Sequence, residues 1–461
     1  MLFFASTLVF ASVARADTAA SPSAGAVLTA DSSGAPSATA APSADSSTTR
    51  PAAPPAPFSL SRPDTAQTVV TLDELMTIAM RQSPLLLARD ADRRAALERV
   101  PRAGALPDPE LTWEFLGAPL DDAAPTSASE NRFQVSQRFP FPGKRGLERK
   151  EASASADVTG ASLDTARLAV ATALRKSFYH LHHLHDSIES LEESRDAMQA
   201  FAEIAQQRYE VGKSPQQDLL KAHVELATEE ARLAAFRAEI PAVHARINAI
   251  LGRDLVAPLA RPEVPDSLVP PERVEDLVAR AYRRSPTLRA AEAEVDRATS
   301  GVGLAKKEAW PDFTLGAGYM AMKDAPDAWM GMAGITLPIW RGAKVAPARR
   351  EAEAGLAAAE ADRDQIRRDV AASVREARAA VVAAQARAEA LDETALPRAE
   401  QAFESTRFAY ENGSATFLDL LDAQRTLLSL RLDYDEAFMD ALMAGADLAA
   451  AVGDVPEVPH E

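Results

Sequence analysis

The chain has 461 residues, a formal net charge of −17 and no cysteine. Its length fits two or three ordinary domains. The absence of cysteine excludes a disulfide framework, a thiolate metal site, a thiol nucleophile and a lipid-acceptor thiol. The acidic balance argues against nucleic-acid binding, which requires a basic face, and is interpreted as a contribution to solubility.

Residues 1–16 are apolar and end in Ala14, Arg15 and Ala16. This pattern predicts a secretory signal peptide with an A-x-A cleavage site, although a positive n-region is missing. The alternative is an apolar terminus with no role in export. Residues 17–67 are mainly Ala, Ser, Thr, Pro and Gly, which predicts a disordered linker because so few large apolar side chains are present.

The remainder divides into two repeats, residues 68–270 and 271–461. Thr71 and Glu74 form a capping-box pattern at the start of the first repeat. A Ser-Pro pair that begins a helix occurs at Ser83 and returns at Ser285, at an offset of about 200 residues. This offset indicates an internal duplication.

Each repeat contains a predicted β-hairpin, at residues 108–139 in the first and 311–339 in the second. The strands alternate apolar and polar side chains, as in Leu111, Trp113 and Phe115. Each strand has about the nine to eleven residues that a tilted strand needs to cross a bilayer. Because a closed membrane barrel starts at about eight strands and one chain supplies four, a membrane role requires oligomerisation.

Long helices are predicted after each hairpin, at residues 147–210 and 343–411, and Pro397 predicts a kink in the second. Return helices are predicted at residues 215–251 and 415–452. A heptad seam in the second long helix predicts a helix–helix contact. Its positions are Ile366, Val370, Val374, Ala377, Val381, Ala384, Ala388, Leu391 and Ala395.

One motif joins each long helix to its return helix. Residues 208–222 read RYEVGKSPQQDLLKA, and residues 408–423 read FAYENGSATFLDLLDA. Because a glycine can leave a helix through a left-handed residue, Gly212 and Gly413 predict the turns at the tips of two helical hairpins.

Repeated units of helix, β-hairpin, long helix, glycine tip and return helix resemble the TolC-type outer membrane efflux channels, over residues from about 68 to 453. The resemblance implies a mainly α fold with a transmembrane β-barrel contribution. It further implies a homotrimer in which twelve strands close one barrel and the helices form a periplasmic α-barrel. The tip of that barrel would face a periplasmic adaptor and an inner-membrane pump of the RND type.

The same resemblance implies roles for residues at the tips. Asp419 and Asp422 match the acids that constrict the pore, although acids at a helix start also simply favour the helix dipole. Tyr410 and Asp218 match a latch that holds the closed tip by a hydroxyl-to-carboxylate hydrogen bond, whereas Tyr410 could instead pack on its own helix. Ala415 stands where some family members carry an arginine, so the latch is expected to be weaker or to use one of two lysines. These are Lys213 and Lys221.

The proline corner with Gly143, Lys144 and Arg145, together with Leu396-Pro397, resembles the heavy-metal branch of the family. Four histidines could suggest a metal site, since His at positions i and i+3 can chelate. They alternate with leucines and have no counterpart in the second repeat, so a solvated or packing role is expected, with no metal and no cofactor. They are His180, His182, His183 and His185.

Three functions compete: an outer membrane duct, a periplasmic coiled-coil adaptor or scaffold without a barrel, and an enzyme. The sequence lacks the H-E-x-x-H, G-x-S-x-G and phosphate-binding glycine-loop motifs, which disfavours an enzyme. An adaptor would carry one helical hairpin rather than two in tandem. The sequence therefore predicts a passive exit duct in the outer membrane, in contact with lipid and not with nucleic acid, which exports metal cations or organic compounds.

Overall fold

The computed structural model describes residues 69–118, 124–265 and 268–456. These residues belong to one compact unit, residues 62–461. The predicted signal peptide, residues 1–16, and the predicted linker, residues 17–67, lie outside the described residues. None of the helices in the described part of the chain is long and apolar enough to cross a membrane.

The described chain opens with strand β1 (Val69–Thr71) and helix α1 (Leu72–Gln82). The predicted capping box is confirmed, because the Glu74 amide donates to Thr71 Oγ1 over 3.4 Å and the Thr71 amide donates to Glu74 Oε2 over 3.2 Å. Helix α2 (Pro84–Ala103) begins at the first predicted Ser-Pro pair. The second repeat has the corresponding helices α5 (Val274–Arg284) and α6 (Pro286–Lys307).

The two predicted hairpins form a single antiparallel sheet with the strand order β2-β3-β5-β6. Pairing between the hairpins runs from Glu130, opposite Met322, to Phe139, opposite Phe313. A short 3-10 turn, η1 (Pro125–Ser127), lies between β2 and β3. The strands are β2 (Glu110–Leu116), β3 (Glu130–Phe139), β5 (Asp312–Met322) and β6 (Ala328–Thr336).

The last strand is shorter than predicted. It was expected to reach residue 339 but ends at Thr336. Pro338 has no amide hydrogen to donate to a strand ladder, and it also restricts the backbone of Leu337 before it. The chain therefore leaves the sheet two residues before the proline.

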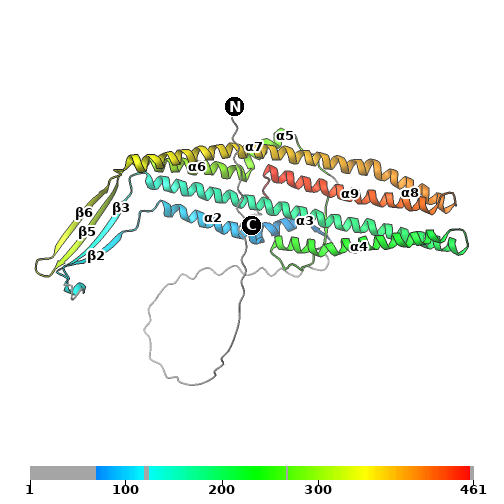
Figure 1. Ribbon diagram of the computed structural model, residues 1–461, viewed down its shortest axis with the longest axis horizontal. Helices are drawn as coiled ribbons and strands as arrows, with labels where there is room; N and C mark the ends of the chain where they lie inside the picture. Colours follow the sequence, from blue (N-terminus) through cyan, green and yellow to red (C-terminus); the bar gives the residue numbers. More distant parts are fainter. Residues whose placement is uncertain (1–68, 119–123, 266–267, 457–461) are drawn as a thin grey trace, which may run out of the picture. The chain divides into compact units, whose positions relative to one another are not determined.

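Two long helical segments run from the sheet to the two turns at the other end, and a shorter helix returns from each turn beside them without reaching the sheet, as Figure 1 shows. The first hairpin consists of α3 (Lys144–Glu210) and α4 (Gln216–Leu251). The second consists of α7 (Ala346–Ala390), α8 (Leu396–Glu411) and α9 (Phe417–Val452). Strand β4 (Arg261–Glu263) pairs in parallel with β1 and connects the repeats.

The second long helix is interrupted, whereas a single helix with a kink was predicted. A π-helical turn, η3 (Leu391–Ala395), separates α7 from α8, and another, η2 (Arg341–Val345), precedes α7. Pro397 lacks an amide hydrogen and its ring would crowd the carbonyl of Glu393 in a regular helix. The wider π turn just before the proline accommodates this conflict.

The hydrophobic core lies between the packed helices. The predicted heptad seam is largely confirmed, because Val370, Val374, Val381 and Ala388 are buried. Part of this seam packs against Leu277 and Val278 of α5. A larger cluster joins α1 to α3 and α4 and contains Leu75, Ala79, Leu174, Phe178, Leu181 and Ile247. One face of α3 is therefore covered by α1.

Candidate functional site at the two hairpin tips

Both glycine turns have the predicted left-handed geometry. Gly212 has a φ of 70° and Gly413 a φ of 76°. The amide after each glycine bonds back to the end of the incoming helix: Lys213 N reaches Arg208 O over 2.7 Å, and Ser414 N reaches Ala409 O over 2.8 Å. These bonds satisfy carbonyls that a helix end otherwise leaves unpaired. The two copies of the motif thus build the same kind of reversal.

The helix that follows the second turn starts with a capping box. Asp419 N donates to Thr416 Oγ1 over 3.2 Å, while Asp419 Oδ2 accepts from the Thr416 amide over 2.9 Å and from its hydroxyl over 2.7 Å. The bonds from Thr416 hold the pKa of Asp419 below its usual value. Asp419 thus caps the helix through hydrogen bonds, whereas the sequence alternative considered only the helix dipole.

The first tip is capped differently. Pro215 occupies the position of Thr416 and offers no side-chain cap to α4. Asp218 instead accepts a hydrogen bond from Ser214 Oγ over 2.8 Å. Lys221 stands where the second copy has Asp422. The two tips therefore differ in charge as well as in their hydrogen bonds.

Tyr410 is buried between the two hairpins, with 3% of its surface exposed. Its ring packs edge-on against Phe417 at 5.9 Å, and burial raises the pKa of its hydroxyl. Among the described residues the hydroxyl has no hydrogen-bond partner, Asp218 included. The latch inferred for Tyr410 and Asp218 stays a prediction.

Arg208 makes the contact that crosses between the tips. Its Nη2 donates to Tyr410 O over 2.8 Å and to Glu411 O over 3.1 Å, and its guanidinium lies 4.2 Å from the centre of the Tyr410 ring. These carbonyls belong to the last turn of α8, where a cation is favoured. The sequence interpretation quoted Arg208 but gave it no role, because the second copy has Ala409 at the matching position.

A row of buried polar residues ties three helices together behind the tips. Ser194 of α3 donates to Glu229 Oε1 of α4 over 2.7 Å and accepts from Gln424 Nε2 of α9 over 2.9 Å. Arg425 of α9 donates through Nε to Glu225 of α4 over 2.9 Å. Glu229 is 1% exposed, and this burial raises the pKa of its carboxyl. The hydrogen bond from Ser194 only partly offsets this effect of burial.

Helix α9 carries an acidic face that begins at the predicted pore residues. Asp419 and Asp422 are exposed and lie one turn apart. Further residues of α9 lie on the same face, because they follow at alternating steps of four and three residues, which is a heptad spacing. All of these residues are exposed or half-buried. The opposite face is buried and includes Leu420, Leu421, Leu427 and Leu428. The acidic face of α9 consists of Asp419, Asp422, Thr426, Ser429, Asp433, Glu436, Asp440, Met443 and Asp447.

Some acids of this face are paired with neighbouring helices. Arg387 of α7 lies 3.6 Å from Glu436 and 3.4 Å from Asp440. Lys176 of α3 lies 2.7 Å from Asp447. No ion pair joins Asp419 or Asp422 to a basic side chain in the described part of the chain. The negative charge of the acidic face is therefore least compensated at the tip.

Three of the four histidines of α3 have different partners. His180 Nε2 lies 3.1 Å from Glu239 of α4, and His182 Nε2 lies 3.1 Å from Asp186 one turn along α3. His183 contacts Ser187, and burial lowers its pKa. Within residues 69–118, 124–265 and 268–456, no group of three or more His, Cys, Asp or Glu is arranged to hold a metal ion.

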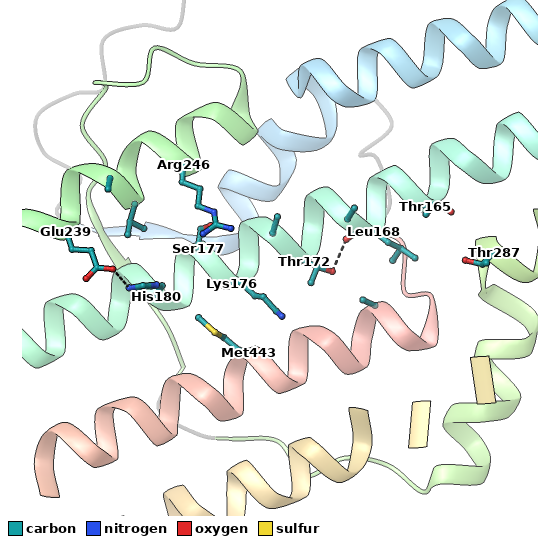
Figure 2. Close-up of a pocket in the computed structure, with 15 residues that line it drawn as sticks. Thr165, Leu168, Thr172, Lys176, Ser177, His180, Glu239, Arg246, Thr287 and Met443 are labelled. Carbon is teal, nitrogen blue, oxygen red and sulfur yellow. Dashed lines mark hydrogen bonds and ion pairs between the residues drawn. The ribbon is translucent and has the colours of Figure 1, made fainter. Parts of the chain in front are cut away.

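His180 also lines the largest cavity among those described, of about 940 Å³. Figure 2 shows this cavity between α3, α4 and α9, with Lys176 and His180 on α3 and Met443 on α9. Met443 belongs to the acidic face of α9, so one wall of the cavity is shared with that face.

Comparison with known proteins assigns the chain to a family. The family model described as outer membrane efflux protein matches residues 75–253 and 277–454, which include both hairpin tips. The chain belongs to the outer membrane efflux protein family.

Two curated relatives cover most of the chain. The cobalt-zinc-cadmium resistance protein CzcC of Cupriavidus metallidurans is 26% identical over 374 residues, which are 79% of this chain and 85% of CzcC. The outer membrane protein TolC of Vibrio cholerae is 25% identical over 407 residues, which are 84% of this chain and 91% of TolC. The similarity thus extends across both repeats.

Solved structures share the fold. CusC superposes with a TM-score of 0.72 at 16% identity, covering 83% of this chain and 92% of CusC. The open state of the Neisseria gonorrhoeae MtrE outer membrane channel superposes with a TM-score of 0.71 at 17% identity, covering 83% of this chain and 88% of MtrE. The predicted fold class, an α-barrel combined with a membrane β-barrel, is confirmed.

Family membership establishes the general role. The protein is the outer membrane channel of a tripartite efflux system, with its sheet in the membrane and its helices extending into the periplasm. The adaptor alternative is not supported. Members of the family are trimeric channels that work with adaptors and inner-membrane pumps, and the relatives are channel proteins rather than enzymes.

Proposed function

We propose that this chain forms a homotrimer that exports metal cations through a gate built by Asp419 and Asp422. The sheet of one chain has two free edges, β2 and β6. In a membrane these edges need partners, because unpaired backbone groups are very unfavourable in lipid. Three copies supply twelve strands, which are enough to close a barrel.

The observation that carries the proposal is the acidic face of α9. Its acids lie on the exposed side of a helix whose other side is buried against the same chain. If the acidic face lines the axis of the trimer, three copies of Asp419 and Asp422 form a ring of six carboxylates. Such a ring attracts cations and repels anions.

The two acids then have different shares in the gate. Asp419 accepts two hydrogen bonds from Thr416, which direct one of its oxygens toward the helix start. Asp422 has no such capping bond and is exposed. We therefore expect Asp422 to contribute most of the electrostatic field that a passing ion experiences. Asp419 also stabilises the start of α9 through its capping box.

Metal cations are proposed as cargo because they match this charge and because a relative that covers most of the chain is a cobalt-zinc-cadmium resistance protein. The chain itself supplies a passive, water-filled path. A periplasmic adaptor and an RND-type pump are proposed as partners. The pump would supply the energy, and docking of the adaptor would separate the hairpin tips.

The test is ion selectivity in planar bilayers. The variant with Asp419→Asn and Asp422→Asn is compared with the wild type under a salt gradient, and the reversal potential gives the cation-to-anion permeability ratio. A control with Asp392→Asn and Glu393→Gln removes the same charge from the exposed π turn before α8. We expect selectivity to fall in the first variant only, and an unchanged ratio would remove both acids from the gate.

A further inference from the structure

Positive charge gathers where the sheet meets the long helices, although the chain as a whole is strongly acidic. A cavity of about 310 Å³ lies there, between the starts of α3 and β5 and the segment that follows β6. Three basic side chains line it: Arg138, Lys144 and Lys344. Its two acids are Glu308 and Asp312.

One of these acids is fully engaged inside the protein. Asp312 is buried and accepts from Lys144 Nζ over 2.7 Å, from Arg138 Nη2 over 2.7 Å and from the Phe141 amide over 2.9 Å. Two cations share this one carboxylate, so the wall of the cavity keeps an excess of positive charge. Arg138 remains half exposed, with 59% of its side chain accessible.

A third cation is free. Lys344 is exposed, and among the described residues its side chain forms no ion pair. Two further cations near the cavity contact backbone carbonyls: Lys307 donates to Pro142 O over 3.1 Å, and Arg341 donates to Ala309 O over 3.2 Å. Lys307 Nζ also lies 5.5 Å from the centre of the Phe141 ring. These contacts fix the position of both cations without neutralising their charge.

The rim of the cavity is apolar and exposed. Leu337, Ile339 and Trp340 are 60%, 72% and 71% exposed, and Trp310 is 54% exposed. Large aromatic and aliphatic side chains beside basic ones are typical of the level at which lipid headgroups meet water. The junction lies between the membrane sheet and the periplasmic helices (Figure 1), so this level belongs to the inner leaflet of the outer membrane.

We propose that this junction binds the phosphodiester headgroup of a phospholipid of that leaflet. Lys344 and Arg138 contact the phosphate, because basic pockets at a membrane surface attract anionic headgroups. Trp340 and Ile339 lie against the glycerol and the first methylene groups of the acyl chains. The inference rests on the location of the protein in the outer membrane and is independent of the cargo and of the gate.

Lipid binding to the intact, detergent-extracted assembly tests this directly. Native mass spectrometry would follow a titration with dioleoyl phosphatidylglycerol and, in parallel, with dioleoylglycerol, which has the same acyl chains and no phosphate. Lys344→Gln is compared with Lys213→Gln, which removes another exposed lysine at the distant first tip. Trp340→Ser tests the apolar part of the site.

We expect phosphatidylglycerol to bind and dioleoylglycerol to bind far less. Lys344→Gln should weaken phosphatidylglycerol binding about fivefold, the effect of one cation at a membrane surface, and Trp340→Ser should weaken it as well. Lys213→Gln should have no effect. Equal binding by Lys344→Gln and wild type, or equal binding of both lipids, would overturn the proposal. Displacement of the lipid by inorganic phosphate at equal concentration would also overturn it, because it would reveal a site for free anions.

Discussion

Replacing Arg208 by Gln should loosen the closed tip. Arg208 joins the two hairpins of one protomer through two hydrogen bonds to carbonyls of α8 and through the face of the Tyr410 ring. An opening movement that separates the two tips must break all three contacts. Glutamine is too short and uncharged, so it cannot replace them.

The size of the effect follows from these contacts. Hydrogen bonds from a charged donor contribute about 1.5–3 kcal/mol each, and a cation–π contact near the surface about 0.5–1 kcal/mol. The lower limits for the two hydrogen bonds and the ring contact together give about 3.5 kcal/mol. Because Arg208 is only partly buried, solvent screens these contacts, and we therefore take about 2 kcal/mol per protomer. That free energy corresponds to a change of about 30-fold in the equilibrium between closed and open tips.

The assay is the open probability of single channels in planar bilayers. Arg407→Gln is the matched control, since Arg407 lies near the second tip and, among the described residues, its side chain pairs only with Glu404 within α8. Arg208→Lys should give an intermediate result, because lysine keeps the charge but cannot reach both carbonyls and the ring with one planar group. An open probability of Arg208→Gln equal to that of wild type would refute the role of Arg208.

Three further predictions concern acids that are buried or half-buried. Burial and nearby Asp186 raise the pKa of the Asp435 carboxyl to about 7. The folded state therefore binds this proton more tightly than the unfolded state, and the protein loses stability as the pH rises from about 4 to 7. The gain in Tm from Asp435→Asn should be larger at pH 8 than at pH 5, and an equal gain at both would contradict this. Glu229→Gln should raise Tm at pH 8, whereas Glu229→Ala should lower it by leaving the Ser194 hydroxyl without its acceptor in a buried site; a lower Tm for both variants would argue against the assigned burial effect. Asp312→Ala should destabilise the detergent-extracted protein by about 3–5 kcal/mol, because Lys144 would lose its partner in a buried site; chemical denaturation measures this, and a loss below about 1 kcal/mol would contradict it.

Local features of the fold could be predicted from the sequence because they depend on neighbouring residues. The capping box of Thr71 and Glu74 and the left-handed glycines at 212 and 413 are fixed by backbone geometry within a few positions. The duplication then placed equivalent elements in both repeats. The end of β6 and the π turn before Pro397 were missed. A proline restricts the backbone of the residue before it, and in a helix its ring also crowds the carbonyl four residues earlier, so its effect on the preceding segment can be a shortened strand or a widened helical turn.

The contacts between hairpins could not be predicted. Arg208 meets Tyr410, and Ser194 meets Gln424, across separations of 202 and 230 residues. Neither pair is repeated at the matching positions of the other half of the chain, so the internal duplication gave no sign of these contacts. Glu229 looks like a solvated helix residue in the sequence, and only the packing of three helices shows that it is buried. Strands β1 and β4 were missed since each has three residues and no alternating pattern.

The central claim, that three copies of this chain form one conducting channel, is tested most directly by measuring the native mass and the conductance of the same detergent-extracted sample. We expect a trimer that inserts into planar bilayers and passes cations in preference to anions. A monomer or dimer that shows no channel activity would contradict the claim.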